Sequence, residues 1–298
     1  MFFVWLFVSF LHSFGPGKNA AALIGDRMIE ARAAGWQGTV MQTDIDKIVR
    51  QAVDIVGRAS RIPMQYFRAP LDLEAKADDS PVTVADRTTE AFIRDELTRA
   101  FPEDGIFGEE FGTENLDAEA AWIIDPIDGT RSFITGNPLF GMLLGRFVDE
   151  TPQIGIVRMP ALDETYVGAV GRGATRNGEV IACRKTTALS GAMVYVNEAE
   201  KLNAADPDRF SRLCSVGHTR RMAYDCYPHA LVASGQIDAV VDCGLEPYDY
   251  LPLVALVEAA GGVMCDWAGD PLGLGSDGRV ITAATPTLRD DLLEILGA

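Results

Sequence analysis

The stretch IIDPIDGTRSF, residues 123–133, ends an apolar run with two aspartates that stand three positions apart. Pro126 stiffens the chain between Asp125 and Asp128, and Gly129 follows them. Turn chemistry alone accounts for the proline and the glycine. It does not account for two like charges, which are unfavourable this close together unless a positive group lies between them. The stretch therefore predicts a buried strand that ends in a cation site.

Two more groups of carboxylates are expected at turns. Glu109 and Glu110 come directly after a short apolar run, and Asp249 lies in EPYDYLP, residues 246–252. Glycine or proline stands beside each group, so the chain is expected to turn there. A fold that brings the groups together creates an oxygen-rich anionic pocket, which suits hard cations such as Mg²⁺. Each group alone is typical of a solvated turn; the combination is more specific.

The residues around the two aspartates indicate how a phosphate would bind beside the cation. Pro126 restricts the backbone and can direct the carbonyl of Ile127 inward as a further oxygen ligand. Gly129 allows a ligand to approach the chain closely. The amides of Gly129, Thr130 and Arg131 are expected to begin a helix, and helix N-termini receive phosphate. We therefore predict a metal ion between the aspartates and a phosphate on these amides.

The composition is that of a globular protein with an acidic balance. The chain has 298 residues, of which 48% are apolar and 23% charged, and its formal net charge is −17. No basic surface is implied, which argues against a nucleic acid as partner. Solubility alone accounts for such an acidic balance. An anionic substrate would need a local positive centre, such as a metal ion.

Cysteine and histidine usage argues against a disulfide framework and against zinc. The five cysteines are odd in number and show no C-x-x-C spacing, which predicts reduced thiols and a cytoplasmic location. The three histidines form no ligand cluster, so a zinc site is not expected. We interpret Cys226 as a packing residue and His229 as a hydrogen-bonded core histidine.

The N-terminal run MFFVWLFVSFLHSF, residues 1–14, has the length of a signal peptide but lacks a positive n-region. It is too short for a comfortable membrane span. Three interpretations remain open: a weak signal peptide, a membrane-associated tail, or a start codon placed too far upstream. We favour the last, with Met28 or Met41 as the true start. Residues 1–40 are then a leader outside the domain, and no membrane partner is expected.

The remainder divides into two expected subdomains: an α+β region at 41–182 with the metal and phosphate motifs, and an α/β region at 183–298 with substrate-side residues. Apolar spacing predicts a helix within 43–67, with Asp44 near its start, and another from about Asp86 to Phe101. Strands are expected within 105–112, 121–129, 139–149 and 151–160, and RNGE, residues 176–179, suits a hairpin turn. After Cys183, strands and helices alternate up to residue 269.

Three motifs resemble those of the inositol monophosphatase family of metal-dependent phosphatases. FGEEFG at 107–112 is similar to its G-E-E motif, and WIIDPIDGTRSF at 122–133 is similar to its D-P-[IL]-D-G-T motif. The segment 246–269 resembles its C-terminal W-D…AGG motif, with Tyr248 where tryptophan is common. The resemblance runs from about Thr43 to the C-terminus. It implies a layered α-β-α-β-α sandwich, two to three Mg²⁺ ions, inhibition by Li⁺ and a homodimer.

The resemblance also implies residue roles. The metal positions are matched by Glu109, Asp125, the carbonyl of Ile127, Asp128 and Asp249. Thr130 and Glu109 would orient the attacking water, and Asp86 matches an aspartate that supports that threonine or a weaker metal.

Within the family, the sequence resembles histidinol-phosphate phosphatases in the segments 76–90, 125–145 and 221–253. Asp225 and Asp242 match substrate-side positions, although Asp242 stands where glutamate is usual. Ala223 and Tyr224 replace the smaller residues often found there. The substrate contacts expected from the resemblance are Ile127, Asp128, Gly129, Thr130, Ala223, Tyr224, Asp225, Asp242 and Asp249.

These observations favour an enzyme that hydrolyses a small phosphomonoester with Mg²⁺, and L-histidinol phosphate is the expected substrate. An inositol or sugar monophosphatase is the alternative. A metal-binding protein without turnover is a third hypothesis, which the full set of expected ligands disfavours.

Overall fold

The computed structural model describes residues 39–69, 73–75, 81–149 and 151–297. Contacts between residues divide the chain into Met1–Asp46 and Lys47–Ala298. Of the expected leader, only Thr39 and Val40 are described, and both are helical; the remaining residues of the leader lie outside the described part. The division expected at 182/183 stays a prediction. It falls within the second unit, between the two sheets described below.

The larger sheet has eight strands in the spatial order β10-β9-β8-β7-β6-β5-β3-β4. Its neighbours pair antiparallel except for β3 and β5, which are parallel. In chain order the strands are β3 (Gly105–Gly108), β4 (Gly112–Glu114), β5 (Ala120–Asp128), β6 (Gly141–Val148), β7 (Thr151–Met159), β8 (Glu164–Ala169), β9 (Gly173–Arg176) and β10 (Glu179–Ile181). Every residue of β5 is buried, which confirms the strand predicted there.

The hairpin predicted at RNGE joins β9 to β10. Arg176 pairs with Glu179, so the loop consists of Asn177 and Gly178. Both have positive φ, 51° and 82°, as a type I′ turn requires.

Two long helices, α3 (Thr39–Ala59) and α4 (Val84–Ala100), follow one another before the larger sheet. They are joined by an ion pair between Arg58 and Glu96, whose closest atoms are 2.7 Å apart. Within Lys47–Ala298, α4 packs on β5. Both helices begin earlier than predicted. Asp44 therefore lies in the second turn of α3 and not at its start.

The smaller sheet has five strands in the order β12-β11-β13-β15-β14. Its strands are β11 (Met193–Asn197), β12 (Thr219–Ala223), β13 (Ala239–Asp242), β14 (Val263–Asp266) and β15 (Val280–Ala283). β11 pairs parallel with both β12 and β13, so the carboxyl ends of these three strands lie at one edge. That edge faces the candidate site described below.

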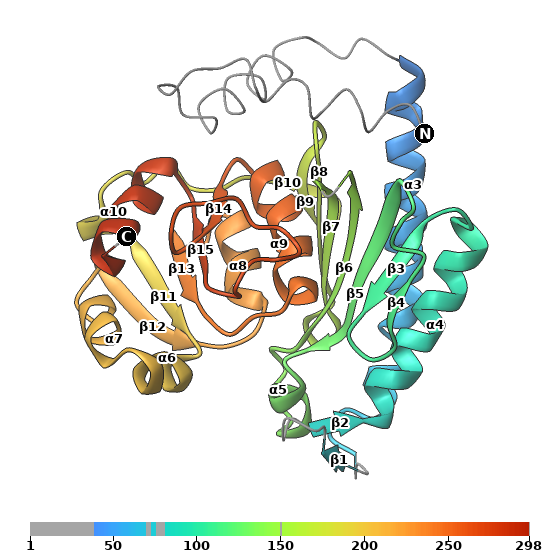
Figure 1. The fold of residues 1–298 in the computed structure, drawn as a ribbon, viewed down its shortest axis with the longest axis horizontal. Coiled ribbons are helices and arrows are strands. Elements are labelled where there is room, and N and C mark those ends of the chain that lie inside the picture. The colour runs from blue at the N-terminus through green and yellow to red at the C-terminus, as the bar shows by residue number, and fades with distance from the viewer. Residues whose placement is uncertain (1–38, 70–72, 76–80, 150, 298) are drawn as a thin grey trace, which may run out of the picture. The chain divides into compact units, whose positions relative to one another are not determined.

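The helices of this half are α6 (Ala199–Ala205), α7 (Pro207–Leu213), α8 (Tyr227–Ala233), α9 (Pro247–Ala259) and α10 (Pro286–Leu296). α9 packs on β6, β7 and β8 of the larger sheet and on β14 of the smaller one, while α8 packs on β13 and β15. α10 covers β15 and contacts α7. Within Lys47–Ala298 the layers run helix, sheet, helix, sheet, helix (Figure 1), which confirms the predicted α-β-α-β-α sandwich.

Several short elements complete the described fold, and some were not assigned from the sequence. β1 (Leu73–Ala75) and β2 (Pro81–Thr83) form a small antiparallel pair, and α5 (Thr130–Ile134) follows β5. The sequence patterns did not reveal β12, β15, α6 or α10. β12 was not predicted because it is an edge strand with exposed residues from Thr219 to Met222 and no apolar alternation.

A row of three glycines seats α9 on the larger sheet. Gly145 pairs with Gly155, which pairs with Gly168. A Cβ on Gly155 would lie 1.9 Å from the carbonyl oxygen of Pro252, and one on Gly168 would lie 2.4 Å from the Cα of Leu256. The helix backbone therefore lies directly on the sheet backbone, closer than larger side chains would permit.

The helices in the part of the chain that the structure describes include none that is long and apolar enough to span a membrane.

Candidate active site

A β-bulge places the two aspartates of β5 on the same side. In a regular strand, residues three apart point to opposite faces of the sheet. Here Asp125 pairs with Leu143 and Asp128 with Gly141, so β5 has one more residue than β6 between these pairs. The extra residue restores the alignment of the two side chains. The backbone N–H of Ile127 donates to Oδ1 of Asp125 at 3.0 Å within this bulge.

Asp249 approaches the same point from the first turn of α9. It forms a capping box with Glu246, whose backbone N–H donates to Oδ2 of Asp249 at 2.8 Å. Pro247 is the first helical residue, a position where its missing N–H has no intrahelical partner to lose. Because the three glycines allow α9 to pack closely on the sheet, the Asp249 carboxylate lies at the end of β5.

Carboxylate oxygens of Asp125, Asp128 and Asp249 lie within 4.8 Å of one another, close enough to hold a metal ion. Burial raises the pKa of Asp125 well above its usual range, and the nearby charges of Glu109, Asp128 and Asp249 raise it further. Burial likewise raises the pKa of Asp249 to about 7, with a further contribution from Glu109. The cluster is thus an oxygen-only donor set whose negative charge is poorly compensated within the protein, a match for a hard divalent cation.

Glu109 and Asp86 adjoin this cluster. Glu109 follows β3, and its backbone N–H donates to the carbonyl of Ile124 on β5 at 3.1 Å. Asp86 is buried in the first turn of α4. The negative charges of both carboxylates contribute to the raised pKa of Asp125. Glu109 and Asp86, the latter implied by the family resemblance, thus lie within electrostatic reach of the three aspartates that could hold a metal ion.

Asp128 also fixes the start of α8. Its Oδ2 accepts the backbone N–H of Cys226 at 2.5 Å. The Cys226 thiol is buried and lies 4.0 Å from the sulfur of Met159, as expected for a packing residue. The hydrogen bond joins positions 98 residues apart, and local sequence carries no signal for it.

The turn after β5 presents Ile127, Gly129 and Thr130. The Thr130 hydroxyl donates to the carbonyl of Ile127 at 3.3 Å, which leaves that oxygen a second lone pair. Gly129 is the N-cap of α5 with φ of 85°. α5 is a single short helix of five residues, and Thr130 and Arg131 open it.

Asp225 lies beside this turn. A Cβ on Gly129 would lie 2.5 Å from the carboxyl carbon of Asp225, so glycine is needed for their close approach. The Ser132 hydroxyl donates to Oδ2 of Asp225 at 2.5 Å. Burial raises the pKa of Asp225 to about 6; the Ser132 hydrogen bond opposes this rise, and the charge of Glu198 adds to it. Ala223 ends β12, and Tyr224 is exposed next to it.

Asp242, which was expected on the substrate side, forms a network of hydrogen bonds within the protein, and its substrate-side role stays a prediction. Its side chain is buried, and both oxygens are taken within the protein. Oδ1 accepts the backbone N–H of Cys243 at 2.8 Å, and Oδ2 lies 2.7 Å from Nδ2 of Asn197 and 3.0 Å from Nε2 of His229. His229 is also bonded to Thr282, which confirms it as a core histidine. Asp242 is the centre of a buried network beneath the site.

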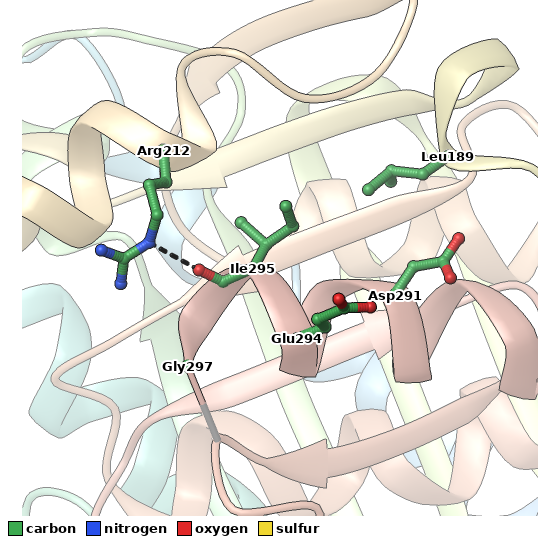
Figure 2. Close-up of a pocket in the computed structure, with 6 residues that line it drawn as sticks. All are labelled: Leu189, Arg212, Asp291, Glu294, Ile295 and Gly297. Carbon is green, nitrogen blue, oxygen red and sulfur yellow. Dashed lines mark hydrogen bonds between the residues drawn. The ribbon is translucent and has the colours of Figure 1, made fainter.

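A separate cavity of about 560 Å³ lies between α10, Leu189 and α7 (Figure 2). Arg212 points to the C-terminal end of α10, where its Nε donates to the carbonyl of Ile295 at 2.7 Å. The residues that line this cavity include none of the carboxylates described above. The motifs and the cavity therefore mark different places, and the motifs define the candidate site.

Comparisons with known proteins identify the family of this chain. Residues 44–297 match the Inositol monophosphatase family. The chain is 36% identical over 251 residues to "Histidinol-phosphatase" of Chlorobaculum parvum, covering 83% of this chain and 95% of that protein. It is also 36% identical over 229 residues to "Bifunctional phosphatase IMPL2, chloroplastic" of Arabidopsis thaliana, covering 76% of this chain and 66% of the plant protein.

Among solved structures, an inositol monophosphatase from Zymomonas mobilis superposes with a TM-score of 0.77 and 38% identity, covering 85% of this chain and 98% of that one. The family match includes all the carboxylates gathered at the end of β5. The chain belongs to the inositol monophosphatase family.

Proposed function

We propose that this protein is a Mg²⁺-dependent phosphatase that hydrolyses L-histidinol phosphate to L-histidinol. The assignment as a metal-dependent phosphatase follows from the family, whose members are metal-dependent phosphomonoesterases acting on small substrates. The choice of histidinol phosphate as substrate is supported mainly by Asp225, a carboxylate that adjoins the Gly129 turn and lies near Asp128. Histidinol phosphate carries a protonated amine, whereas inositol phosphates carry only hydroxyls. An acidic side chain beside the phosphate turn suits the amine.

The proposed metal ligands are Glu109, Asp125, the carbonyl of Ile127, Asp128 and Asp249. Their oxygen-only chemistry and the raised pKa values of Asp125 and Asp249 are what such a site would show without its ion. Bound Mg²⁺ would neutralise the phosphate charge, lower the pKa of a water molecule and stabilise the leaving alkoxide.

The other roles belong to residues of the turn and its surroundings. Thr130, whose hydroxyl is already oriented by the Ile127 carbonyl, would hold the attacking water in line together with Glu109. Asp86 would support this arrangement from α4. The backbone of Gly129 and Thr130 would contact the phosphate. Ala223 and Tyr224 would border the substrate, and Asp225 would accept a hydrogen bond from its amine. No covalent phospho-enzyme is required.

An inositol or sugar monophosphatase is the second candidate. It is supported by the Zymomonas mobilis inositol monophosphatase, whose 38% identity is similar to the 36% shared with the Chlorobaculum parvum histidinol-phosphatase. The homodimer and inhibition by Li⁺ remain predictions from the family resemblance, and the cytoplasmic location remains a prediction from the cysteine usage.

The experiment that separates the two candidates compares Asp225→Ala with the wild type. A charge-assisted hydrogen bond contributes about 1.5–3 kcal/mol. We therefore expect kcat/KM for histidinol phosphate to fall by about tenfold or more. Glycerol phosphate, which has no amine, should lose much less. Ser132→Ala is the matched control, because it removes the hydroxyl donor to Asp225 but keeps the carboxylate.

Equal losses on both substrates would return the inositol-type assignment to first place. The melting temperature of each variant is measured in parallel. Wild-type protein that releases no phosphate from either substrate or from inositol phosphate with Mg²⁺ would support a binding protein without turnover.

A further inference from the structure

We propose that Glu90, a buried residue of α4, is a positioning residue that holds Glu109 in place by binding the backbone of its loop. This inference rests on the metal role proposed above for Glu109. Glu90 itself contacts neither the cluster of aspartates nor the Gly129 turn in any hydrogen bond described here, and it acts through the chain that carries Glu109.

The loop that carries Glu109 is a tight hairpin between β3 and β4. Gly108 pairs with Gly112, so the loop consists of Glu109, Glu110 and Phe111. Gly112 closes it with φ of 69°, the left-handed conformation that such three-residue loops use. The backbone N–H of Glu109 donates to Ile124 on β5. One side of the loop is thereby tied to the strand that ends in the aspartates.

Glu90 ties the other side. Its Oε2 accepts the backbone N–H of Glu110 at 2.7 Å, and its Oε1 accepts that of Phe111 at 3.2 Å. The Glu90 side chain is 0% exposed, so water does not compete for these bonds. All three N–H groups of the loop are thus engaged, and the backbone of Glu109 is held on both flanks.

Charge and space at this point are both adapted to the Glu90 carboxylate. Nε of Arg94 lies 2.8 Å from Oε1 of Glu90, and the Arg94 side chain also donates to the carbonyl of Gly112. The arginine thus compensates the buried charge. A Cβ on Gly108 would lie 2.0 Å from Oε1 of Glu90, so the carboxylate occupies the space that a side chain at 108 would fill. Both glycines of FGEEFG therefore serve this loop.

The test replaces Glu90 with glutamine, which has nearly the same size but only one acceptor oxygen. At least one loop N–H then loses its acceptor, because the amide group that takes the other place is a donor. We expect the dissociation constant for Mg²⁺, measured by titration calorimetry without substrate, to rise about 10- to 100-fold. The value of kcat at saturating Mg²⁺ should fall much less than activity at low Mg²⁺.

A matched control lies at the opposite end of β3. Asp104 accepts the indole N–H of Trp122 at 2.9 Å and lies 2.8 Å from Nε of Arg146, so it is also a shielded carboxylate paired with an arginine. Asp104→Asn should lower the melting temperature and leave Mg²⁺ affinity unchanged. If Glu90→Gln behaves in the same way, Glu90 is only structural and the inference is wrong.

A second variant covers the case in which Glu90→Gln does not fold. Glu90→Asp keeps the charge beside Arg94 but withdraws the carboxylate by one methylene, and it should weaken Mg²⁺ binding in the same direction. Unchanged affinity in this variant would overturn the inference. Wild-type protein that binds no Mg²⁺ would instead overturn the proposed function, and this inference with it.

Discussion

Asp249→Asn should make the metal-free protein more stable while it destroys the proposed metal site. The carboxylate at 249 is crowded by Glu109 and desolvated by burial, and its pKa is raised from 3.8 to about 7. Asparagine keeps an oxygen that can accept the N–H of Glu246, so the helix cap survives. What is removed is the cost of holding a negative charge at this point.

The size of the expected stabilisation follows from the raised pKa of Asp249. A rise of about 3 units corresponds to about 4 kcal/mol at pH values above the folded-state pKa. Because some burial cost remains for the amide, we expect about half of this value, or about 2 kcal/mol. At the size of this chain that is an increase in melting temperature of about 4 °C.

The effect of Asp249→Asn on the free energy of unfolding depends on pH. A group whose pKa is raised on folding contributes stability below its unfolded pKa, and that contribution is lost as the pH rises through the folded pKa. The wild type should therefore lose stability between about pH 4 and pH 8, and Asp249→Asn should lose less.

The assay is thermal unfolding with a chelator at pH 5 and pH 8. The variant should gain at pH 8 and gain little at pH 5, and Mg²⁺ should stabilise only the wild type. A variant that is less stable than the wild type at pH 8, or shifted equally at both pH values, would refute the reasoning.

Three further predictions concern the turn, the metal and the leader. Asp128→Asn should keep the fold, because its amide oxygen can accept the Cys226 N–H, but turnover at saturating Mg²⁺ should fall about a hundredfold or more; a near wild-type rate would contradict the proposed site. Gly129→Ala should lower the free energy of unfolding by about 1–2 kcal/mol for the positive φ alone, measured by urea denaturation, and an unchanged midpoint would exclude the close approach to Asp225. Removal of residues 1–40 leaves the family match at residues 44–297 intact and should leave kcat/KM unchanged; loss of activity would make the leader part of the domain.

Local signals in the sequence were enough to predict single strands, turns and the paired aspartates, whereas the layered sandwich was implied by the family resemblance. Asp125 and Asp128 belong to one buried strand, and the hairpin at Asn177 and Gly178 follows from two residues. The ends of strands and the turns could therefore be predicted where glycine, proline and acidic residues follow an apolar run.

The supporting contacts were not accessible, because they join distant parts of the chain. Nothing near Glu90 in the sequence indicates that it binds amides 20 and 21 residues away. The buried contacts of Asp242 were missed for the same reason. Its position matched a substrate-side residue, but only the fold reveals that Asn197 and His229 reach its carboxylate first.

The three glycines under α9 have a consequence for the ion selectivity of the proposed metal site. Asp249 belongs to α9, whereas Asp125 and Asp128 belong to the sheet. We therefore expect the distance between helix and sheet to influence the spacing of the carboxylate oxygens. Mg²⁺ requires oxygens at about 2.0–2.1 Å and Ca²⁺ at about 2.3–2.6 Å. Gly145→Ala adds a methyl group 2.8 Å from Cγ2 of Ile123 on β5 and 3.1 Å from Cγ of Pro252 on α9. We expect it to lower the preference for Mg²⁺ over Ca²⁺, a change in ion selectivity caused by a residue that touches no ion.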